Sequence, residues 1–276
     1  MLGAIIGDIA GSRFEFKPMN RYHFDLFTKE CDFTDDTICT VAVADAIIND
    51  RDFGACVHEW CRRYPCPMGG YGGRFARWVH SDEPMPYKSF GNGAAMRVSP
   101  IAWFADSREK ALELAAKTAA ITHDHPEGIK GAQTVALAIF NALQGMDVKA
   151  VLEDCVKFSG YNIDLELDDV QNKFDETCQG TVPVALWIIG QSSSFEGAIR
   201  RAICLGADAD TLGAIVGSIA EAIWGIPEDM QQEMMHYLPS DMKRVVLQFC
   251  RRYIKDCVLV AGDGDEGVAI DLIPQD

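Results

Sequence analysis

Paired aspartates beside threonines occur twice in this 276-residue chain, as TDDT at residues 34–37 and as DADT at residues 208–211. An apolar stretch follows each segment. Aspartate and threonine are common at helix starts, where they accept hydrogen bonds from free backbone N–H groups and complement the helix dipole. One such segment would indicate helix capping. Two of them, each ahead of an apolar helix, can bring four carboxylates together near the core.

Four neighbouring carboxylates repel one another strongly unless cations bind between them. Oxygen ligands select hard ions such as Mg²⁺ or Mn²⁺ over zinc. Two such ions, about 3.5–4 Å apart, can orient a substrate and activate water. Helix capping and a two-metal site both remain open on these residues. The metal hypothesis uses six of them: Thr34, Asp35, Asp36, Asp208, Asp210 and Thr211.

Two other metal-dependent chemistries share parts of this pattern. Phosphatases of the haloacid-dehalogenase type use an apolar strand followed by DxDxT, but here Thr211 arrives one position early. All-helical isoprenoid synthases use DDxxD, but no third aspartate follows Asp35 and Asp36 at that spacing. These departures weaken both interpretations.

Most of the chain has apolar residues at helical spacing, and no region alternates strictly between polar and apolar residues. The pattern therefore predicts an all-α fold, compact and in a single domain over residues 1–276. The expected helices are 34–49, 108–121, 128–143, 146–158, 181–190, 195–204, 210–224 and 240–255. Segments rich in glycine and proline predict loops at 62–74 and 81–93, and the acidic tail 261–276 is expected to be partly flexible.

Glycines recur every four residues in two places. Gly3, Gly7 and Gly11 would share one face of a helix, and so would Gly213 and Gly217. Small residues along one face allow two helix backbones to approach closely, so we expect tight helix packing there.

The net charge of −16 argues against a nucleic-acid-binding surface, which needs clustered Lys and Arg. A local anion site remains compatible with it, because backbone N–H groups and metals also bind phosphate. We find no signal peptide and no run of about 20 apolar residues for a membrane helix. The ten cysteines form no CxxC pair, which favours reduced thiols in a cytoplasmic protein. The even spacing of Cys56, Cys61 and Cys66 fits no metal-ligand pattern.

Five segments, taken together and in this order, resemble the ADP-ribosylglycohydrolase family. The family includes dinitrogenase-reductase-activating glycohydrolases and ADP-ribosyl-acceptor hydrolases. The segments span roughly four fifths of the chain, and each alone is weak. They are GDIAGSRFE at 7–15, FTDDT at 33–37, GNGAAMR at 91–97, Thr122-His123 with Gly128, Gly131 and Ala132, and GADADT at 206–211.

The resemblance implies an all-α orthogonal bundle that binds two Mg²⁺ or Mn²⁺ ions through the six residues of the metal hypothesis. It further implies that Glu15, on a mobile loop, acts as general acid/base or positions the attacking water. Asp36 joins Glu15 as a candidate catalytic residue. The metals would bind hydroxyls of the ribose and stabilise an oxocarbenium-like transition state.

The resemblance also places ADP-ribose on glycine-rich loops. Residues 69–73 would wrap the diphosphate with backbone N–H groups, and Phe90 would offer its ring to adenine. The implied substrate contacts are Gly70, Tyr71, Gly72, Gly73, Ser89, Phe90, Gly91, Asn92 and His123. Arg97 could instead be a structural ion pair. His123 and His125 form an HxH pair, but the zinc enzymes that use one place it on a barrel strand, which this sequence lacks.

The expected function is therefore metal-dependent hydrolysis of the bond between ADP-ribose and an acceptor, with free ADP-ribose as product. The substrate would be an ADP-ribosylated protein or small molecule. The acidic composition weakly favours a basic acceptor such as arginine. Two alternatives stay open: a protein that binds ADP-ribose without cleaving it, and another two-metal hydrolase such as a phosphatase.

Overall fold

The computed structural model describes residues 1–254 and 257–259. Within these ranges the chain is helical and has no strand, apart from a single bridge between Gly91 and Thr177. The all-α prediction is confirmed. The predicted acidic tail, 261–276, lies outside the described residues. In the described part, no helix is both long and apolar enough to cross a membrane.

Each of the eight predicted helices is present, with ends that differ by a few residues. Capping side chains explain two of these differences. The helix predicted from residue 146 begins at Val148, because Asp147 accepts a hydrogen bond from Ala150 N at 2.8 Å. The helix predicted from 181 begins at Cys178, because Thr177 accepts from Gly180 N at 3.0 Å.

The sequence did not predict several further helices. Some, such as Phe53–Arg63 and Glu228–Tyr237, are short and carry few buried apolar residues. The elements are α1 Leu2–Gly11, the 3₁₀ turn η1 Ser12–Phe14, α2 Asp35–Ile48, α3 Phe53–Arg63, α4 Gly73–His80, α5 Gly93–Met96, α6 Ser99–Phe104, α7 Arg108–Ala120, α8 Pro126–Leu143, α9 Val148–Ser159, α10 Leu167–Val170, α11 Cys178–Gly190, α12 Phe195–Cys204, α13 Ala209–Trp224, α14 Glu228–Tyr237 and α15 Ser240–Tyr253.

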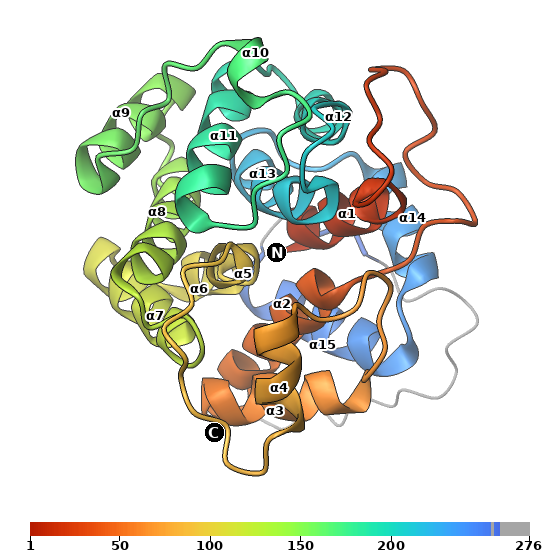
Figure 1. Ribbon diagram of the computed structural model, residues 1–276, viewed down its shortest axis with the longest axis vertical. Coiled ribbons are helices and arrows are strands. Elements are labelled where there is room, and N and C mark those ends of the chain that lie inside the picture. Colours follow the sequence, from red (N-terminus) through yellow and green to blue (C-terminus); the bar gives the residue numbers. More distant parts are fainter. Residues whose placement is uncertain (255–256, 260–276) are drawn as a thin grey trace.

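Helices α1 and α13 lie antiparallel at the middle of the molecule, with α8 and α11 beside α13 and with α3 and α15 beside α2 (Figure 1). The predicted glycine faces meet here. A Cβ atom added to Gly3 or Gly7 would collide with the backbone carbonyl of Gly217 or Gly213. The expectation of close helix packing is therefore confirmed.

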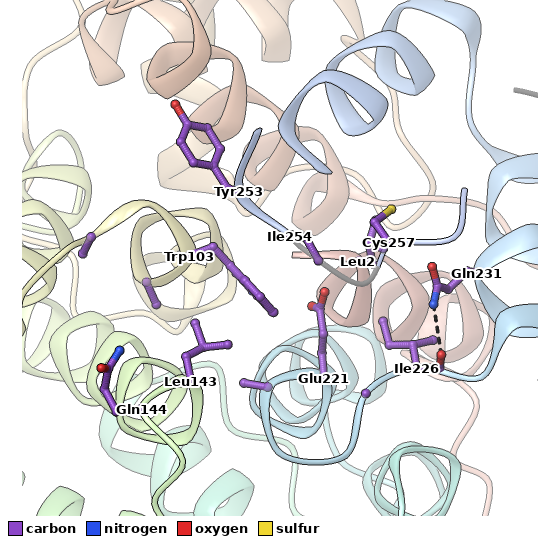
Figure 2. Close-up of a pocket in the computed structure, with 14 residues that line it drawn as sticks. Leu2, Trp103, Leu143, Gln144, Glu221, Ile226, Gln231, Tyr253, Ile254 and Cys257 are labelled. Atoms are coloured by element: carbon purple, nitrogen blue, oxygen red, sulfur yellow. Dashed lines mark hydrogen bonds between the residues drawn. The ribbon is translucent and has the colours of Figure 1, made fainter. Parts of the chain in front are cut away.

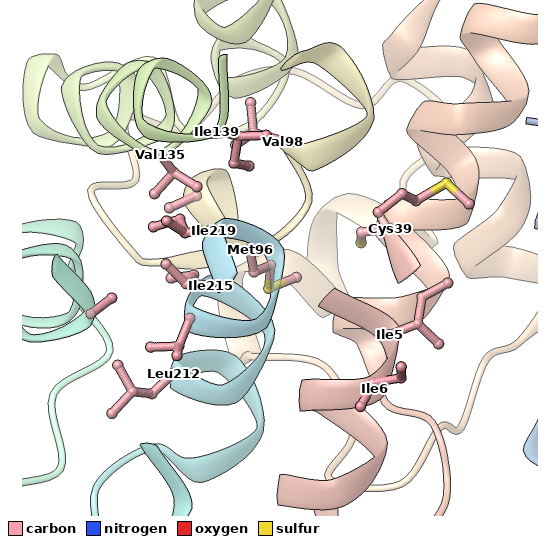
Figure 3. Packing of buried hydrophobic residues seen from close by; sticks show 14 of the residues in the cluster. Ile5, Ile6, Cys39, Met96, Val98, Val135, Ile139, Leu212, Ile215 and Ile219 are labelled. Carbon is pink, nitrogen blue, oxygen red and sulfur yellow. The ribbon is translucent and has the colours of Figure 1, made fainter. Parts of the chain in front are cut away.

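The opposite face of α13 carries the apolar core. Ile215 and Ile219 point toward Val135 and Ile139 of α8, whereas Ile5 and Ile6 belong to α1 (Figure 3). Helix α13 thus contacts one neighbour through its backbone and the other through large side chains. This arrangement fixes its first turn against the last turn of α1, where Gly11 lies against Ala209.

Candidate active site

Three helix ends meet at one place: the last turn of α1, the first turn of α2 and the first turn of α13. They carry Asp8, Asp36 and Asp210, whose carboxylates are buried and provide oxygen atoms all within 4.8 Å of one another. A second group shares Asp210 and adds Glu15 and Asp208, again within 4.8 Å. The two predicted aspartate segments are therefore adjacent in the fold.

Asp8 organises the first turn of α2. Its carboxylate accepts four hydrogen bonds, from Thr34 N at 3.0 Å, Thr34 Oγ1 at 2.7 Å, Thr37 N at 3.0 Å and Thr37 Oγ1 at 2.5 Å. Burial raises the pKa of Asp8 to about 6, and these four bonds oppose the rise. Asp8 was not predicted to be a site residue. An aspartate interrupting an apolar run was the available signal, since a buried carboxylate needs donors.

Asp36 has one satisfied and one free oxygen. Oδ2 accepts from Thr211 Oγ1 at 3.1 Å, and it lies 3.5 Å from Thr34 Oγ1, whose proton goes to Asp8. Oδ1 is buried without a hydrogen-bond partner among the described residues. A buried, unpartnered carboxylate oxygen is costly unless a cation binds it.

The second segment is held by the asparagine of the GNGAAMR motif. Asn92 Nδ2 donates to Asp208 at 2.7 Å. Burial raises the pKa of Asp208 to about 6, while hydrogen bonds with Asp210 and Asn92 lower it. Burial and the neighbouring Asp208 raise the pKa of Asp210 well above its usual range.

Asp35 faces the cleft from the start of α2 and is half-buried. Burial, followed by the charges of Cys39 and Asp210, raises its pKa well above the usual range. Burial and the charge of Asp8 do the same for the pKa of Asp36. The cluster thus has several carboxylates that favour protonation in the absence of a cation. Together with the unpartnered oxygen of Asp36, this all-oxygen donor set fits hard divalent ions.

Glu15 follows the 3₁₀ turn after α1 and reaches toward the acidic cluster. Burial, then the charges of Asp210, Asp8 and Glu176, raises its pKa to about 8. Its carboxylate lies directly against Gly69, where a Cβ atom would overlap it. The backbone of Gly69 has φ of +75°, a conformation that favours glycine.

Glu15, Asp35, Asp208, Asp210 and Thr211 line a cleft of about 460 Å³, whereas Asp8, Thr34 and Asp36 are buried behind this lining. The glycine-rich loop 69–73 forms the wall beyond Glu15 and leads into α4, whose N-terminus has no side-chain cap. Tyr71 anchors the loop through hydrogen bonds from its hydroxyl to the carbonyls of Cys61 at 3.1 Å and Tyr64 at 2.7 Å. Exposed backbone N–H groups at such a loop and helix start suit an anion.

The remaining predicted contacts divide into two sets. Ser89, Gly91, Asn92 and His123 line the cleft. Phe90 does not belong to the lining: its side chain is 41% exposed and packs edge-on against His125, with ring centroids 5.3 Å apart. The structure therefore does not bring Phe90 to the cleft with the other residues of its motif.

The two histidines of the HxH pair have separate surroundings. Burial and the charges of Arg97 and Arg74 lower the pKa of His123, and its Nδ1 lies 2.6 Å from Thr122 Oγ1. His125 Nδ1 accepts from Glu127 N and so caps α8. Among the described residues, neither histidine nor any cysteine belongs to a group with metal-ligand spacing.

Arg97 lies at the base of the cleft and is fully buried. Its Nη2 donates to Thr118 O at 2.9 Å and to Thr122 Oγ1 at 2.8 Å. It forms no salt bridge within the described part of the chain, so the structural ion pair is not found. Arg97 and the exposed Arg74 give this end of the cleft positive charge, opposite in sign to the aspartate end.

A separate cavity of about 450 Å³ lies beside α6, α13 and α14 (Figure 2). Glu221 is its one acidic lining residue among those described, and it pairs with the amino group of Met1 at 2.5 Å. Gln231 donates to the carbonyl of Ile226 at 3.0 Å. This cavity lacks the convergent acidic groups that distinguish the cleft.

Comparisons with known proteins agree with this geometry. The model of the family described as ADP-ribosylglycohydrolase matches residues 1–260. The chain is similar to the ADP-ribosyl-[dinitrogen reductase] glycohydrolase of Rhodospirillum rubrum, at 24% identity over 95% of each chain. It is also similar to ADP-ribosylarginine hydrolase Tri1 of Pseudomonas putida (strain GB-1), at 26% identity over 82% of this chain and 70% of the relative.

A solved structure of an ADP-ribosylglycohydrolase-related protein complex superposes with a TM-score of 0.70. The two chains are 24% identical, and the match covers 92% of this chain and 97% of the other. This likeness shows that the helical arrangement is shared.

Proposed function

The chain belongs to the ADP-ribosylglycohydrolase family, and on this basis we propose that its cleft cleaves the bond between ADP-ribose and an acceptor, releasing ADP-ribose. The observation that carries the proposal is the polarity of the cleft. One end holds converging carboxylates, and the other holds a glycine-rich loop with Arg74 and Arg97. An ADP-ribosyl group has a matching polarity, with neutral ribose hydroxyls at one end and a diphosphate toward the other.

We assign two Mg²⁺ or Mn²⁺ ions to the acidic end. The proposed ligands are Thr34, Asp35, Asp36, Asp208, Asp210 and Thr211. When bound, the ions would supply fixed positive charge that orients the ribose hydroxyls and favours a nucleophilic water. The orphaned oxygen of Asp36 and the raised pKa values in the cluster support this assignment. Asp8 holds the ligand turn through Thr34 and Thr37.

Glu15 is proposed as the residue that holds the attacking water or moves a proton at the anomeric carbon, with Asp36 as the second catalytic candidate. Glu15 is half-buried within reach of Asp208 and Asp210 and lines the cleft. A carboxyl with a pKa of about 8 can exchange a proton near neutral pH.

The diphosphate is assigned to Gly70, Tyr71, Gly72 and Gly73, and the neighbouring ribose to Ser89, Gly91, Asn92 and His123. Asn92 supports this placement because it also donates to Asp208 and so joins the two ends of the cleft. Because Phe90 is exposed outside the cleft lining, adenine stacking on its ring requires the base to extend beyond the cleft.

The test is release of free ADP-ribose, followed by mass, from arginine-linked and serine-linked ADP-ribosyl peptides. Each incubation is run with Mg²⁺, with Mn²⁺ and with EDTA. Release that requires metal supports the proposal. A protein that binds ADP-ribose but releases none would be a binding protein instead, and release of inorganic phosphate would indicate a phosphatase.

A further inference from the structure

Two phenylalanines are exposed at the mouth of the cleft, next to the proposed catalytic glutamate. Phe16 directly follows Glu15, lines the cleft and is 69% exposed. Phe174, from the loop between α10 and α11, is 47% exposed. Their ring centroids are 6.3 Å apart, with 32° between the ring planes. Large apolar side chains exposed side by side at a binding cleft mark a contact surface for a ligand.

Glu176 lies beside this pair and lines the cleft. Its charge contributes to the raised pKa values of Glu15 and Asp208, which places its carboxylate near both. In the described part of the chain, the Glu176 carboxylate forms no hydrogen bond or salt bridge. The adjacent Asp175 is turned into its own loop, where it accepts from Thr177 N at 2.7 Å.

The backbone holds Glu176 in a defined position. The carbonyl of Glu176 accepts a hydrogen bond from Asn92 N at 2.7 Å, and Thr177 bridges to Gly91. The side chain of Asn92 in turn donates to Asp208. The backbone of Glu176 is therefore fixed relative to the acidic cluster, and its exposed side chain extends from this anchored position.

The acceptor must lie at this mouth. The diphosphate is assigned to loop 69–73, so the bond to be cleaved lies near the cluster and Glu15, and the leaving group extends beyond them. The charged residues that line the cleft on this side are all acidic: Glu15, Asp35, Glu176, Asp208 and Asp210. Lys17 and Lys173 lie in the same loops but do not line the cleft.

We infer that Phe16, Phe174 and Glu176 form the acceptor subsite and that it selects a planar cation, the guanidinium of an ADP-ribosylated arginine. This inference rests on the proposed hydrolase function. A guanidinium can stack on an aromatic face and form a paired hydrogen bond with a carboxylate, which a hydroxyl acceptor cannot do. None of the three side chains is needed to bind the ADP-ribose part.

The experiment compares Phe174→Ala and Glu176→Gln with wild type on arginine-linked and serine-linked ADP-ribosyl peptides. Phe174→Ala should raise KM for the arginine-linked peptide about three-fold with little change in kcat. Glu176→Gln should lower kcat/KM for that peptide about ten-fold. Both variants should bind free ADP-ribose as wild type does, because the product lacks the acceptor.

Matched controls are Phe104→Ala, an exposed phenylalanine that packs on Tyr253, and Glu153→Gln, an exposed glutamate on α9. Both should leave the arginine and serine rates unchanged. Equal losses on the two substrates in Glu176→Gln would overturn the subsite, because they would place Glu176 in the general catalytic machinery. So would a wild-type protein that cleaves only the serine-linked peptide. Failure of wild type on both peptides would instead count against the proposed function itself.

Discussion

At the acidic end of the cleft, helix turns carry the carboxylates and hydrogen bonds hold them, as the four bonds to Asp8 show. The other end is formed by the glycine-rich loop 69–73, which is anchored by the hydroxyl of Tyr71. The two ends of the cleft therefore have different structural supports and different roles. Groups that must hold charges at fixed distances are built on packed helices, whereas the loop leaves backbone N–H groups available for the proposed diphosphate.

The largest effect is expected from Asp210→Asn, because Asp210 belongs to both carboxylate groups. Loss of this charge should reduce turnover about 1000-fold or more, since metal assistance contributes several kcal/mol to the transition state. The measurement is kcat for ADP-ribose release, with circular dichroism to verify folding. A folded Asp210→Asn protein with near wild-type turnover would contradict the metal assignment.

Asp8→Asn should weaken metal binding about 10- to 100-fold while leaving the proposed ligands in place. An asparagine offers one acceptor oxygen where the carboxylate of Asp8 receives four hydrogen bonds. Isothermal titration with Mn²⁺ measures the change, and excess metal should restore much of the activity. Unchanged Mn²⁺ affinity would show that Thr34 and Thr37 hold the turn without Asp8.

Gly69→Ala tests the contact between the glycine-rich loop and the carboxylate of Glu15. The new Cβ would strain a backbone with φ of +75° and overlap the Glu15 carboxylate, so kcat should fall about ten-fold. Gly145→Ala is the matched control, because Gly145 has φ of +82° but no atom within 4 Å of the position that a Cβ would take. It should lose about 1 kcal/mol of stability and no activity. Equal activity in the two variants would show that Gly69 does not position Glu15.

The smallest effect is a pH dependence of stability that arises from the carboxylates of the acidic end. Asp8 and Asp208 have folded pKa values of about 6, above the ordinary 3.8, and Glu15 has a pKa of about 8. The native state favours the protonated forms of these groups, so the metal-free protein should lose stability as pH rises from about 4 to about 8; the contributions of Asp8 and Asp208 are lost by about pH 6 and that of Glu15 by about pH 8. In EDTA, the melting temperature at pH 8 should lie several degrees below that at pH 6. Saturating Mg²⁺ should shrink this difference, and an unchanged difference would argue against cation binding by the cluster.

Much of the fold was predictable because long amphipathic helices have a clear period. Helix α1 was harder to predict from the sequence. All ten of its residues are buried, and a helix without a polar face has no alternation of polar and apolar residues to define its period. Only the spacing of Gly3, Gly7 and Gly11 pointed to it. Helix α14 was missed because its ten residues bury only two apolar side chains, Met230 and Met234, which give a weak signal.

At the site, the two aspartate segments could be predicted because helix starts are marked by residue type and spacing. Glu176 could not, because it lies in an irregular loop whose path depends on pairing with Gly91 and Asn92. The orientation of the Phe90 side chain could not be predicted either. Its motif was recognisable, but residue type alone does not determine whether a loop side chain faces the cleft or its neighbour His125.

The antiparallel contact between α1 and α13 also has a consequence for biosynthesis. Asp8 and Asp210 are separated by about 200 positions in sequence, and Gly7 has no backbone to pack against until Gly213 has been made. Contacts of such long range form late and after a large loss of chain entropy. A nascent chain that ends before residue 208 lacks Asp208, Asp210 and Thr211, which are half of the proposed metal ligands, and cannot complete the proposed site. On the ribosome, catalytic competence is therefore gained only once three quarters of the polypeptide has emerged.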